Sequence, residues 1–394
     1  MSSEINRKLN MGMIPLHAPE IQGNEWNYIK ECLDTNWVSS VGPFVDRFEK
    51  EVANYIGAKH AVAVVNGTAA LHTALLVAGV QPDDEVLVPT LTFIASGNAI
   101  RYVGAWPVFI DSEPLHWQMD PQKVIDFLDK KCGWTNRELR NNETGRRVTA
   151  VMPVHILGHP VDMYPIYEAA KKYDLIVIED AAEAIGARYK DQMVGTLGDI
   201  GCFSFNGNKI ITTGGGGMIV TDNEKWAERA HHLTTQAKSD PFEYIHDEVG
   251  FNYRLTNILA AMGCAQLEQL ENYIDVKRGI AGKYDQALAD VPGITLLKQA
   301  PWAESNFWLY TVLVDAASFG MDSRNLMRAL AVKHIQTRPL WQPLHMSPVY
   351  ENMPASQHSV SEEIFKTALS LPCSAGLDVK QQSKVIDALL QTAK

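Results

Sequence analysis

Residues 60–89 read HAVAVVNGTAALHTALLVAGVQPDDEVLVP, and this stretch decides the fold class. The apolar run 60–65 is typical of a buried strand, and the turn at 66–68 leads into a helical pattern that ends at Gly79. A second apolar run at 84–89 predicts the next strand. Continuous apolar strands joined by a helix indicate parallel pairing with both faces of the sheet covered, so we expect an α/β protein.

The same alternation of strand and helix continues to residue 221. Residues 116–147 interrupt it, because this segment is polar and holds one possible short helix. We interpret the segment as an insertion on the surface of a large domain. With the two strands above, further apolar runs make a mostly parallel sheet of seven strands, and they lie at 106–111, 148–156, 175–180, 202–205 and 217–221.

The pattern changes from about Leu255 onward. Apolar residues at helical spacing predict one or two long helices, which are followed by a strand at 308–314 and a helix at 323–333. The C-terminal end is again amphipathic. We therefore expect a large domain over residues 1–269, including the N-terminal segment and the insertion, and a smaller α+β domain over residues 270–394.

The composition is that of a globular chain, with 46% hydrophobic and 21% charged residues. A formal net charge of −11 disfavours nucleic acid as a partner, and no long apolar stretch indicates a membrane span. The N-terminus MSSEINRKLN has no apolar signal region, and five scattered cysteines form no CxxC pair, so we expect a cytoplasmic protein with reduced thiols. His155 and His159 are four residues apart, but Pro160 prevents a helix there, and no metal site is predicted.

A lysine and a run of glycines follow the strand at 202–205. Lys209 stands among small polar residues, four positions before Thr213 and the glycines 214–217. Glycines allow the backbone to approach a ligand closely, and a partly desolvated lysine amine forms Schiff bases. The alternative is a surface lysine in a flexible glycine turn.

Carboxylates end the strand at 175–180. Ligands of open α/β sheets bind at the carboxyl ends of parallel strands, so Asp180 is placed to ion-pair with a protonated pyridine nitrogen. A helix N-cap is the alternative role for this aspartate. Phe93 follows another strand end and suits stacking on a flat cofactor, or core packing instead.

The turn from Asn66 to Ala69 joins a strand to a helix and presents backbone N–H groups at the positive end of the helix dipole. Phosphate binds well at such a position, and the hydroxyl of Ser204 is a further candidate donor. Turns of this kind also cap helices that bind nothing.

Together these motifs resemble the sugar aminotransferase family (DegT/DnrJ/EryC/StrS type) of fold-type I pyridoxal-phosphate enzymes, over nearly the whole chain. The resemblance implies the aspartate-aminotransferase fold and pyridoxal 5'-phosphate as the cofactor. Six motifs in order carry it: Trp37-Val-Ser-Ser-x-Gly42-Pro, Asn66-Gly-Thr-Ala-Ala-Leu, Glu179-Asp180-Ala-Ala, Ser204-Phe-x-x-x-Lys209, Thr213-Gly-x-Gly-Gly217 and Gly250-Phe-Asn252-Tyr-Arg254-Leu.

The resemblance also implies a role for each candidate residue. Lys209 and Asp180 are the catalytic pair, in which the lysine forms the Schiff base and moves the proton, and the aspartate pairs with the ring nitrogen. Glu183 is implied near the ring hydroxyl and Phe93 on the face of the ring. Asn252 is implied to reach the phosphate in the neighbouring subunit of a homodimer, and the phosphate of the same subunit is held by Gly67, Thr68, Ala69 and Ser204.

The chain resembles the branch of this family that is linked to legionaminic acid and related 4-amino sugars. The resemblance lies in the long segment 116–147 and in the residues around Lys209. The implied reaction moves the amino group of L-glutamate to C4 of a UDP-linked 4-keto-6-deoxy-N-acetylhexosamine. One alternative substrate is a GDP- or dTDP-linked keto-sugar, as in perosamine synthases. An alternative function is that of a non-catalytic regulatory or binding protein, which we would expect to have lost Lys209 or Asp180.

Arg254 and Arg338 are candidates for binding the carboxylate or diphosphate of a substrate, or for structural ion pairs.

Overall fold

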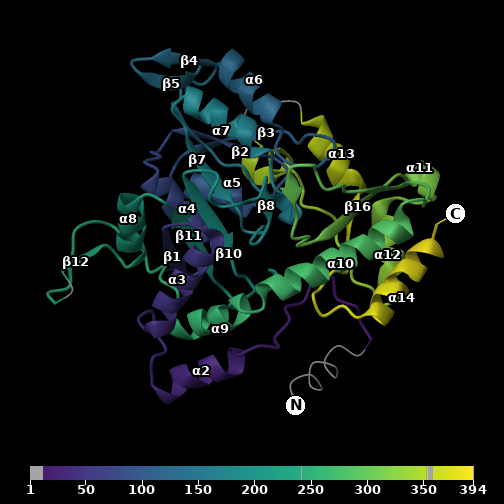
Figure 1. Ribbon diagram of the computed structural model, residues 1–394. Coiled ribbons are helices and arrows are strands. Elements are labelled where there is room, and N and C mark those ends of the chain that lie inside the picture. Colours follow the sequence, from purple (N-terminus) through teal and green to yellow (C-terminus); the bar gives the residue numbers. More distant parts are fainter. Residues whose placement is uncertain (1–11, 241, 352, 354–357, 394) are drawn as a thin grey trace.

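The computed structural model describes residues 12–240, 242–351, 353 and 358–393, so the N-terminal stretch MSSEINRKLN lies outside the described residues. Its centre is a seven-stranded sheet in the order β1-β11-β10-β7-β6-β2-β3 (Figure 1). β11 is antiparallel to both of its neighbours, and the remaining pairings are parallel. The predicted sheet is confirmed, with strands β1 (His60–Val64), β2 (Glu85–Pro89), β3 (Trp106–Ile110), β6 (Val148–Val151), β7 (Ile176–Asp180), β10 (Ile200–Ser204) and β11 (Gly217–Thr221).

Helices cover both faces of this sheet, which is why its strands are mainly apolar. β2, β10 and β11 are buried at every position. α4 (Gly67–Val77) is apolar on nearly all sides and packs against β10 and β11 in the largest apolar cluster. A second apolar cluster lies beneath α6 (Pro121–Lys131) and α7 (Met163–Lys172). α5 (Ala95–Tyr102) and α8 (Glu224–Thr234) complete the cover.

The predicted insertion 116–147 is more structured than its polar sequence indicates. It contains α6 and a hairpin of β4 (Cys132–Thr135) and β5 (Glu138–Asn141), which lie beside α7 at the top of Figure 1. Val124, Leu128 and Leu139 are buried against the core. The hairpin was not predicted, because its strands lack an alternating apolar pattern.

The C-terminal part contains the predicted helices and strand. α9 (Asn257–Leu267) is followed by α10 (Leu270–Leu288), which runs from below the large sheet toward a smaller one (Figure 1). The smaller sheet has the order β14 (Ile294–Leu296), β16 (Tyr310–Val314), β17 (Ala368–Leu371). Below the large sheet, α2 (Glu25–Asp34) and α3 (Pro43–Ile56) pack against α9. Toward the small sheet lie α12 (Ser323–Val332), α13 (Ser359–Thr367) and α14 (Val379–Leu390).

Hydrogen bonds cross the predicted domain boundary at residue 269. Ile14 forms a parallel bridge with Ile335, and the N–H of Ala18 donates to Ser374 Oγ at 2.9 Å, so the first described segment pairs with the C-terminal part. β15 (Ala303–Glu304) pairs in turn with β8 (Arg188–Tyr189) of the large domain. The division into domains 1–269 and 270–394 remains a prediction.

No helix among the described residues is both long and apolar enough to cross a bilayer.

Candidate active site

Lys209 lies in the loop that joins the antiparallel strands β10 and β11. Backbone bonds hold this loop, since the N–H of Phe205 donates to the Gly216 carbonyl at 2.8 Å and the N–H of Thr213 donates to the Phe205 carbonyl at 3.0 Å. The Lys209 side chain is 12% exposed. The alternative of a surface lysine in a flexible turn therefore does not hold.

Two groups flank the Lys209 amine. Nζ lies 3.4 Å from Glu183 Oε1 and 4.0 Å from the centre of the Trp308 ring. Burial raises the pKa of Glu183 to about 7. Two groups oppose this rise: the charge of Lys209, and the N–H of Leu157, which donates a hydrogen bond to Oε2 at 2.8 Å. Trp308 was not among the predicted residues, because no local motif marks a residue that arrives from the C-terminal part of the chain.

Asp180 is the last residue of β7 and is almost fully buried. Its Oδ2 accepts a hydrogen bond from the hydroxyl of Ser96 at 2.7 Å, and its Oδ1 accepts one from the N–H of Ala182 at 3.1 Å. Burial raises the pKa of Asp180, and the bond from Ser96 offsets part of that rise. Residues 181–187 form turns and no helix, so the N-cap alternative does not hold. Ser96 was not predicted.

The neighbouring carboxylate, Glu179, points to the opposite face of the strand and serves the structure. It accepts hydrogen bonds from His155 Nε2 at 3.0 Å and from the backbone N–H groups of Gly195, Leu197 and Gly198. His159 instead has the Pro160 carbonyl and the Ala300 N–H as partners. His155 and His159 thus face different groups and form no common ligand set.

The turn at the start of α4 places the hydroxyl of Ser204 beside the N-terminus of that helix. A Cβ on Gly67 would lie 2.8 Å from Cβ of Ser204, so only glycine permits this approach. The Asn66 side chain caps the helix by accepting from the Ala69 N–H at 2.8 Å. A phosphate contact from Ala69 would have to replace that cap, whereas Gly67 and Thr68 lie in the first turn, where N–H groups have no intrahelical partner.

Phe93 follows β2 and the residue is 54% exposed, so core packing does not explain it. It lies three positions before Ser96, the partner of Asp180. A large aromatic ring is therefore free to cover a flat ligand bound at this edge of the sheet.

The two candidate arginines differ in their surroundings. Arg254 is buried, and its guanidinium binds the carboxylate of Glu49 and the Ala63 carbonyl, so the structure favours the structural alternative for it. Arg338 is exposed, and its backbone pairs with Ser370. Asn252 is also exposed and forms a backbone bridge with Thr235. Within the described residues, no hydrogen bond connects Asn252 to the surroundings of Lys209.

This set of groups fits pyridoxal phosphate. Asp180 is buried with a raised pKa and forms no ion pair within the described chain, so it suits a cationic ring nitrogen. The Gly67–Ser204 approach at a helix N-terminus suits a phosphate. The amine of Lys209 suits the aldehyde, and the exposed ring of Phe93 suits the aromatic face.

Comparison with known proteins agrees with this geometry. Residues 19–390 match the model of the DegT/DnrJ/EryC1/StrS aminotransferase family. The GDP-perosamine synthases of Caulobacter vibrioides and Escherichia coli O157:H7 are 41% and 40% identical to the chain, over 96% of it and 98% of each relative. The crystal structure of DesV from S. venezuelae superposes with a TM-score of 0.84 at 32% identity, covering 93% of this chain and 94% of DesV. The predictions of fold, cofactor and enzyme class are confirmed, and the chain belongs to the DegT/DnrJ/EryC1/StrS family of pyridoxal-phosphate-dependent sugar aminotransferases.

Proposed function

We propose that this enzyme transfers the amino group of L-glutamate to C4 of a nucleotide-linked 4-keto-6-deoxy sugar. The observation that carries the proposal is the amine of Lys209, held 3.4 Å from Glu183 at the sheet edge where Asp180 ends the neighbouring strand β7. When bound there, pyridoxal phosphate supplies an electron sink for the carbon that loses its proton.

Each residue has a distinct task in this proposal. Lys209 Nζ takes the α-proton of glutamate and later delivers a proton to C4 of the sugar. Glu183, with its pKa raised to about 7, stabilises the charge on that amine. Asp180 keeps the ring nitrogen protonated, and Ser96 orients Asp180 through its hydrogen bond.

The nucleotide is GDP in this proposal. The sequence alone favoured a UDP-linked N-acetylhexosamine and the legionaminic-acid branch, with GDP- and dTDP-sugars as alternatives. Two relatives with 41% and 40% identity are both GDP-perosamine synthases, and this supports the GDP alternative over the UDP prediction. Arg338, whose side chain is exposed, is a candidate partner for the diphosphate.

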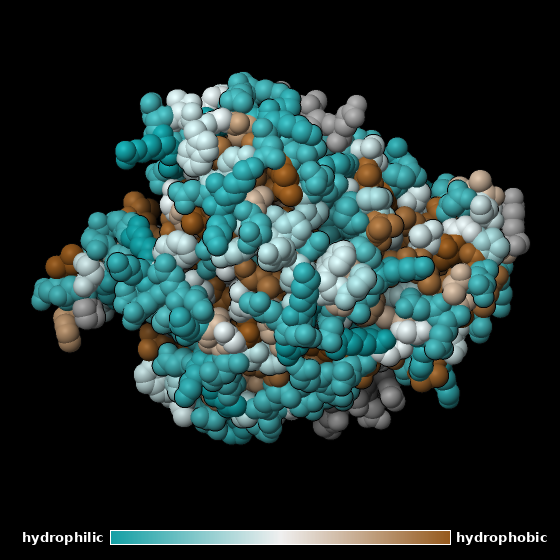
Figure 2. All heavy atoms as spheres, turned by 45° about the horizontal axis from the view of Figure 1, so that its top comes forward, coloured by the Kyte–Doolittle hydropathy of each residue, from teal (hydrophilic) through white to brown (hydrophobic). Residues whose placement is uncertain are grey.

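The active enzyme is proposed to be a homodimer in which Asn252 completes the site of the other subunit. Asn252 follows a hairpin of β12 (Lys238–Asp240) and β13 (Ile245–His246), which projects from the large domain (Figure 1). Its described residues Phe242 and Tyr244 are 87% and 71% exposed, and apolar atoms are visible on this projection at the left of Figure 2. Exposed apolar groups on a projecting element suit a contact with a second copy of the chain.

Complementation tests the shared site. Lys209→Ala and Asn252→Ala protomers, mixed and re-associated, form heterodimers in which one of the two sites has both native residues. We expect activity to return in the mixture, while each variant alone stays impaired. Absence of any recovery in mixtures that contain heterodimers would exclude a shared site.

Spectroscopy separates an enzyme from a non-catalytic binding protein. The native protein loaded with cofactor is expected to absorb in the visible range and to bleach when L-glutamate is added. Lys209→Ala should abolish the band, whereas the exposed Lys225→Ala serves as the matched control and should keep it. A band that survives in Lys209→Ala contradicts the role of this lysine.

A panel of GDP-, UDP- and dTDP-linked 4-keto-6-deoxy sugars then identifies the substrate. Amino transfer is measured as formation of 2-oxoglutarate together with the mass of the amino sugar. The proposal predicts the highest kcat/KM with the GDP-linked sugar. A higher value with the UDP-linked N-acetyl sugar would restore the prediction made from the sequence.

A further inference from the structure

Trp308 is a fixed part of the wall around Lys209. It is almost fully buried and lies just before β16. Its indole Nε1–H donates to the carbonyl of Asn208 at 2.7 Å, and its backbone N–H donates to Asn306 Oδ1 at 2.9 Å. Because the ring and the backbone are both anchored, the indole has one orientation relative to the loop that carries the lysine.

The face of this indole is turned toward the amine. Nζ of Lys209 lies 4.0 Å from the ring centre, well within the range of about 6 Å for attraction between a cation and an aromatic face. Glu183 lies near the same atom at 3.4 Å. The amine is thus flanked by a carboxylate and by the electron-rich face of the best aromatic partner for a cation.

We infer that Trp308 is a positioning residue that favours proton transfer to Lys209 Nζ, an inference that rests on the proposed function. In that step the Cα–H bond of the amino donor breaks, a new N–H bond forms on Nζ, and the electron pair of the broken bond passes to the cofactor. Nζ changes from a neutral amine to an ammonium. The ring quadrupole attracts the ammonium much more than the amine, so Trp308 stabilises the product side of the step more than the reactant side.

The chain offers a control residue in Trp341. Its ring is stacked on that of Trp308 at 6.3 Å between centres and 5° between planes. Removing Trp341 loosens the packing of Trp308 without removing the Trp308 ring that contacts Nζ. An effect confined to Trp308 is therefore separable from a general loss of packing.

The first experiment measures the glutamate half-reaction in single turnover on cofactor-loaded enzyme, with protiated and α-deuterated L-glutamate. Trp308→Leu is expected to slow the reaction about 10-fold and to increase the deuterium isotope effect, with the glutamate dissociation constant unchanged. Trp308→Phe keeps an aromatic face and should lose less, and Trp341→Leu should lose least. Equal losses in all three variants, or a loss confined to glutamate affinity, would overturn the inference.

A second experiment needs neither cofactor nor turnover. Fluorinated tryptophan weakens the ring quadrupole while keeping the ring shape and its N–H, and only a neutral amine reacts with acylating reagents. In apo-protein made with fluorinated tryptophan, acylation of Lys209, counted by peptide mass spectrometry relative to Lys225, should rise about 3-fold or more. The rise should be absent in a Trp308→Phe background. A rise that persists there contradicts the inference, and it does so independently of whether the protein proves to be a sugar aminotransferase.

Discussion

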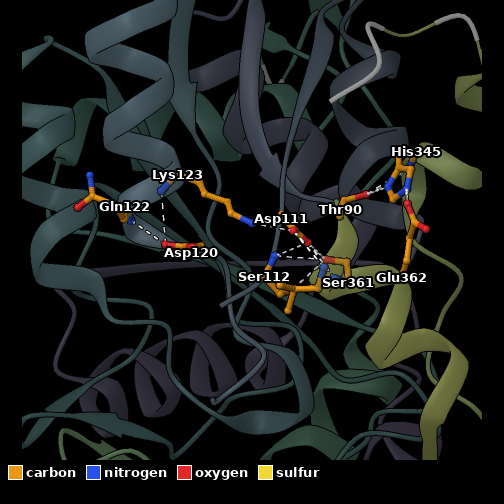
Figure 3. Close-up of polar contacts among 10 residues, drawn as sticks. Thr90, Asp111, Ser112, Asp120, Gln122, Lys123, His345, Ser361 and Glu362 are labelled. Carbon is orange, nitrogen blue, oxygen red and sulfur yellow. Dashed lines mark hydrogen bonds and ion pairs between the residues drawn. The ribbon is translucent and has the colours of Figure 1, made fainter. Parts of the chain in front are cut away.

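Asp180 and Asp111 occupy equivalent positions in one sheet and have opposite environments. Asp180 ends β7, Asp111 directly follows β3, and both are almost completely buried. Asp111 forms an ion pair with Lys123 at 2.7 Å and accepts hydrogen bonds from Ser361 (Figure 3). Burial by itself raises the pKa of Asp111, but these partners outweigh burial and lower the pKa, whereas burial dominates at Asp180 and raises its pKa.

The two aspartates show that this edge of the sheet supplies structural positions as well as positions open to a ligand. Asp111 receives its cation from the same chain and accepts the N–H groups of Val360 and Ser361, so it caps α13 from a distant strand. Nearby, Thr90 and Glu362 bind His345 from the two sides (Figure 3). Asp180 has a hydroxyl and a backbone N–H as partners, which leaves its charge for a ligand. Carboxyl ends of parallel strands supply both kinds of position.

The largest expected effect comes from Asp180→Asn. The variant loses the charge that keeps the ring nitrogen protonated, so we expect the rate of the glutamate half-reaction to fall by at least about 10²-fold. The measurement is bleaching of the visible band in single turnover. Asp111→Asn is the matched control and should bleach at nearly the native rate. If both variants lose activity equally, the division between a chemical and a structural carboxylate is wrong.

Asp111→Asn should instead act on stability. It removes the ion pair with Lys123 and weakens the cap of α13, at a cost of about 2 kcal/mol in the free energy of unfolding. Urea denaturation of the apo-protein measures this change. Asp180→Asn should leave the unfolding midpoint unchanged or raise it, because burying that carboxylate is unfavourable. A larger loss of stability in Asp180→Asn would reverse the comparison.

The two serine partners sharpen the contrast at smaller scale. Ser96→Ala removes the side-chain donor to Asp180 and is expected to lower the half-reaction rate about 10-fold. Ser361→Ala removes the corresponding donor to Asp111 and is expected to lower stability by about 1 kcal/mol with an unchanged rate. Turnover and urea denaturation of both variants check the pair, and a slower half-reaction in Ser361→Ala would argue against it.

The smallest effect is the pH dependence of stability. The pKa of Asp111 is lowered by folding, so its contribution is present above the ordinary aspartate value near 4 and is lost as the pH falls through the folded value. The pKa of Asp180 is raised, so the native protein loses stability as the pH rises from that ordinary value through the folded one. Urea denaturation between about pH 3 and 7 should show that acidification narrows the stability gap between native protein and Asp111→Asn. It should also raise the stability of native protein relative to Asp180→Asn. Expressed as native minus variant, the difference in the free energy of unfolding should fall on acidification for Asp111→Asn and rise for Asp180→Asn. Differences that change with the same sign would contradict these assignments.

The sheet could be predicted from the sequence alone, and so could the candidate residues of the site. Seven apolar runs predicted seven strands, because a strand whose sheet is covered on both faces is mainly apolar. Lys209 and Asp180 were predicted because the chemistry of a Schiff base and of a ring nitrogen requires those residue types beside strand ends, and their catalytic roles remain a prediction. The exposed Phe93 and the close approach at Gly67 agree with the same local reasoning.

The partners that surround those residues could be identified only from the folded chain. Ser96 reaches Asp180 across 84 residues, Trp308 reaches the loop of Lys209 across 100, and Ser361 reaches Asp111 across 250. Arg254, a candidate for substrate from its sequence position, is held by Glu49 across 205 residues. Strands and turns follow from local patterns, but hydrogen bonds between distant segments depend on how the sheets and helices pack, and no local pattern in one sequence records that packing.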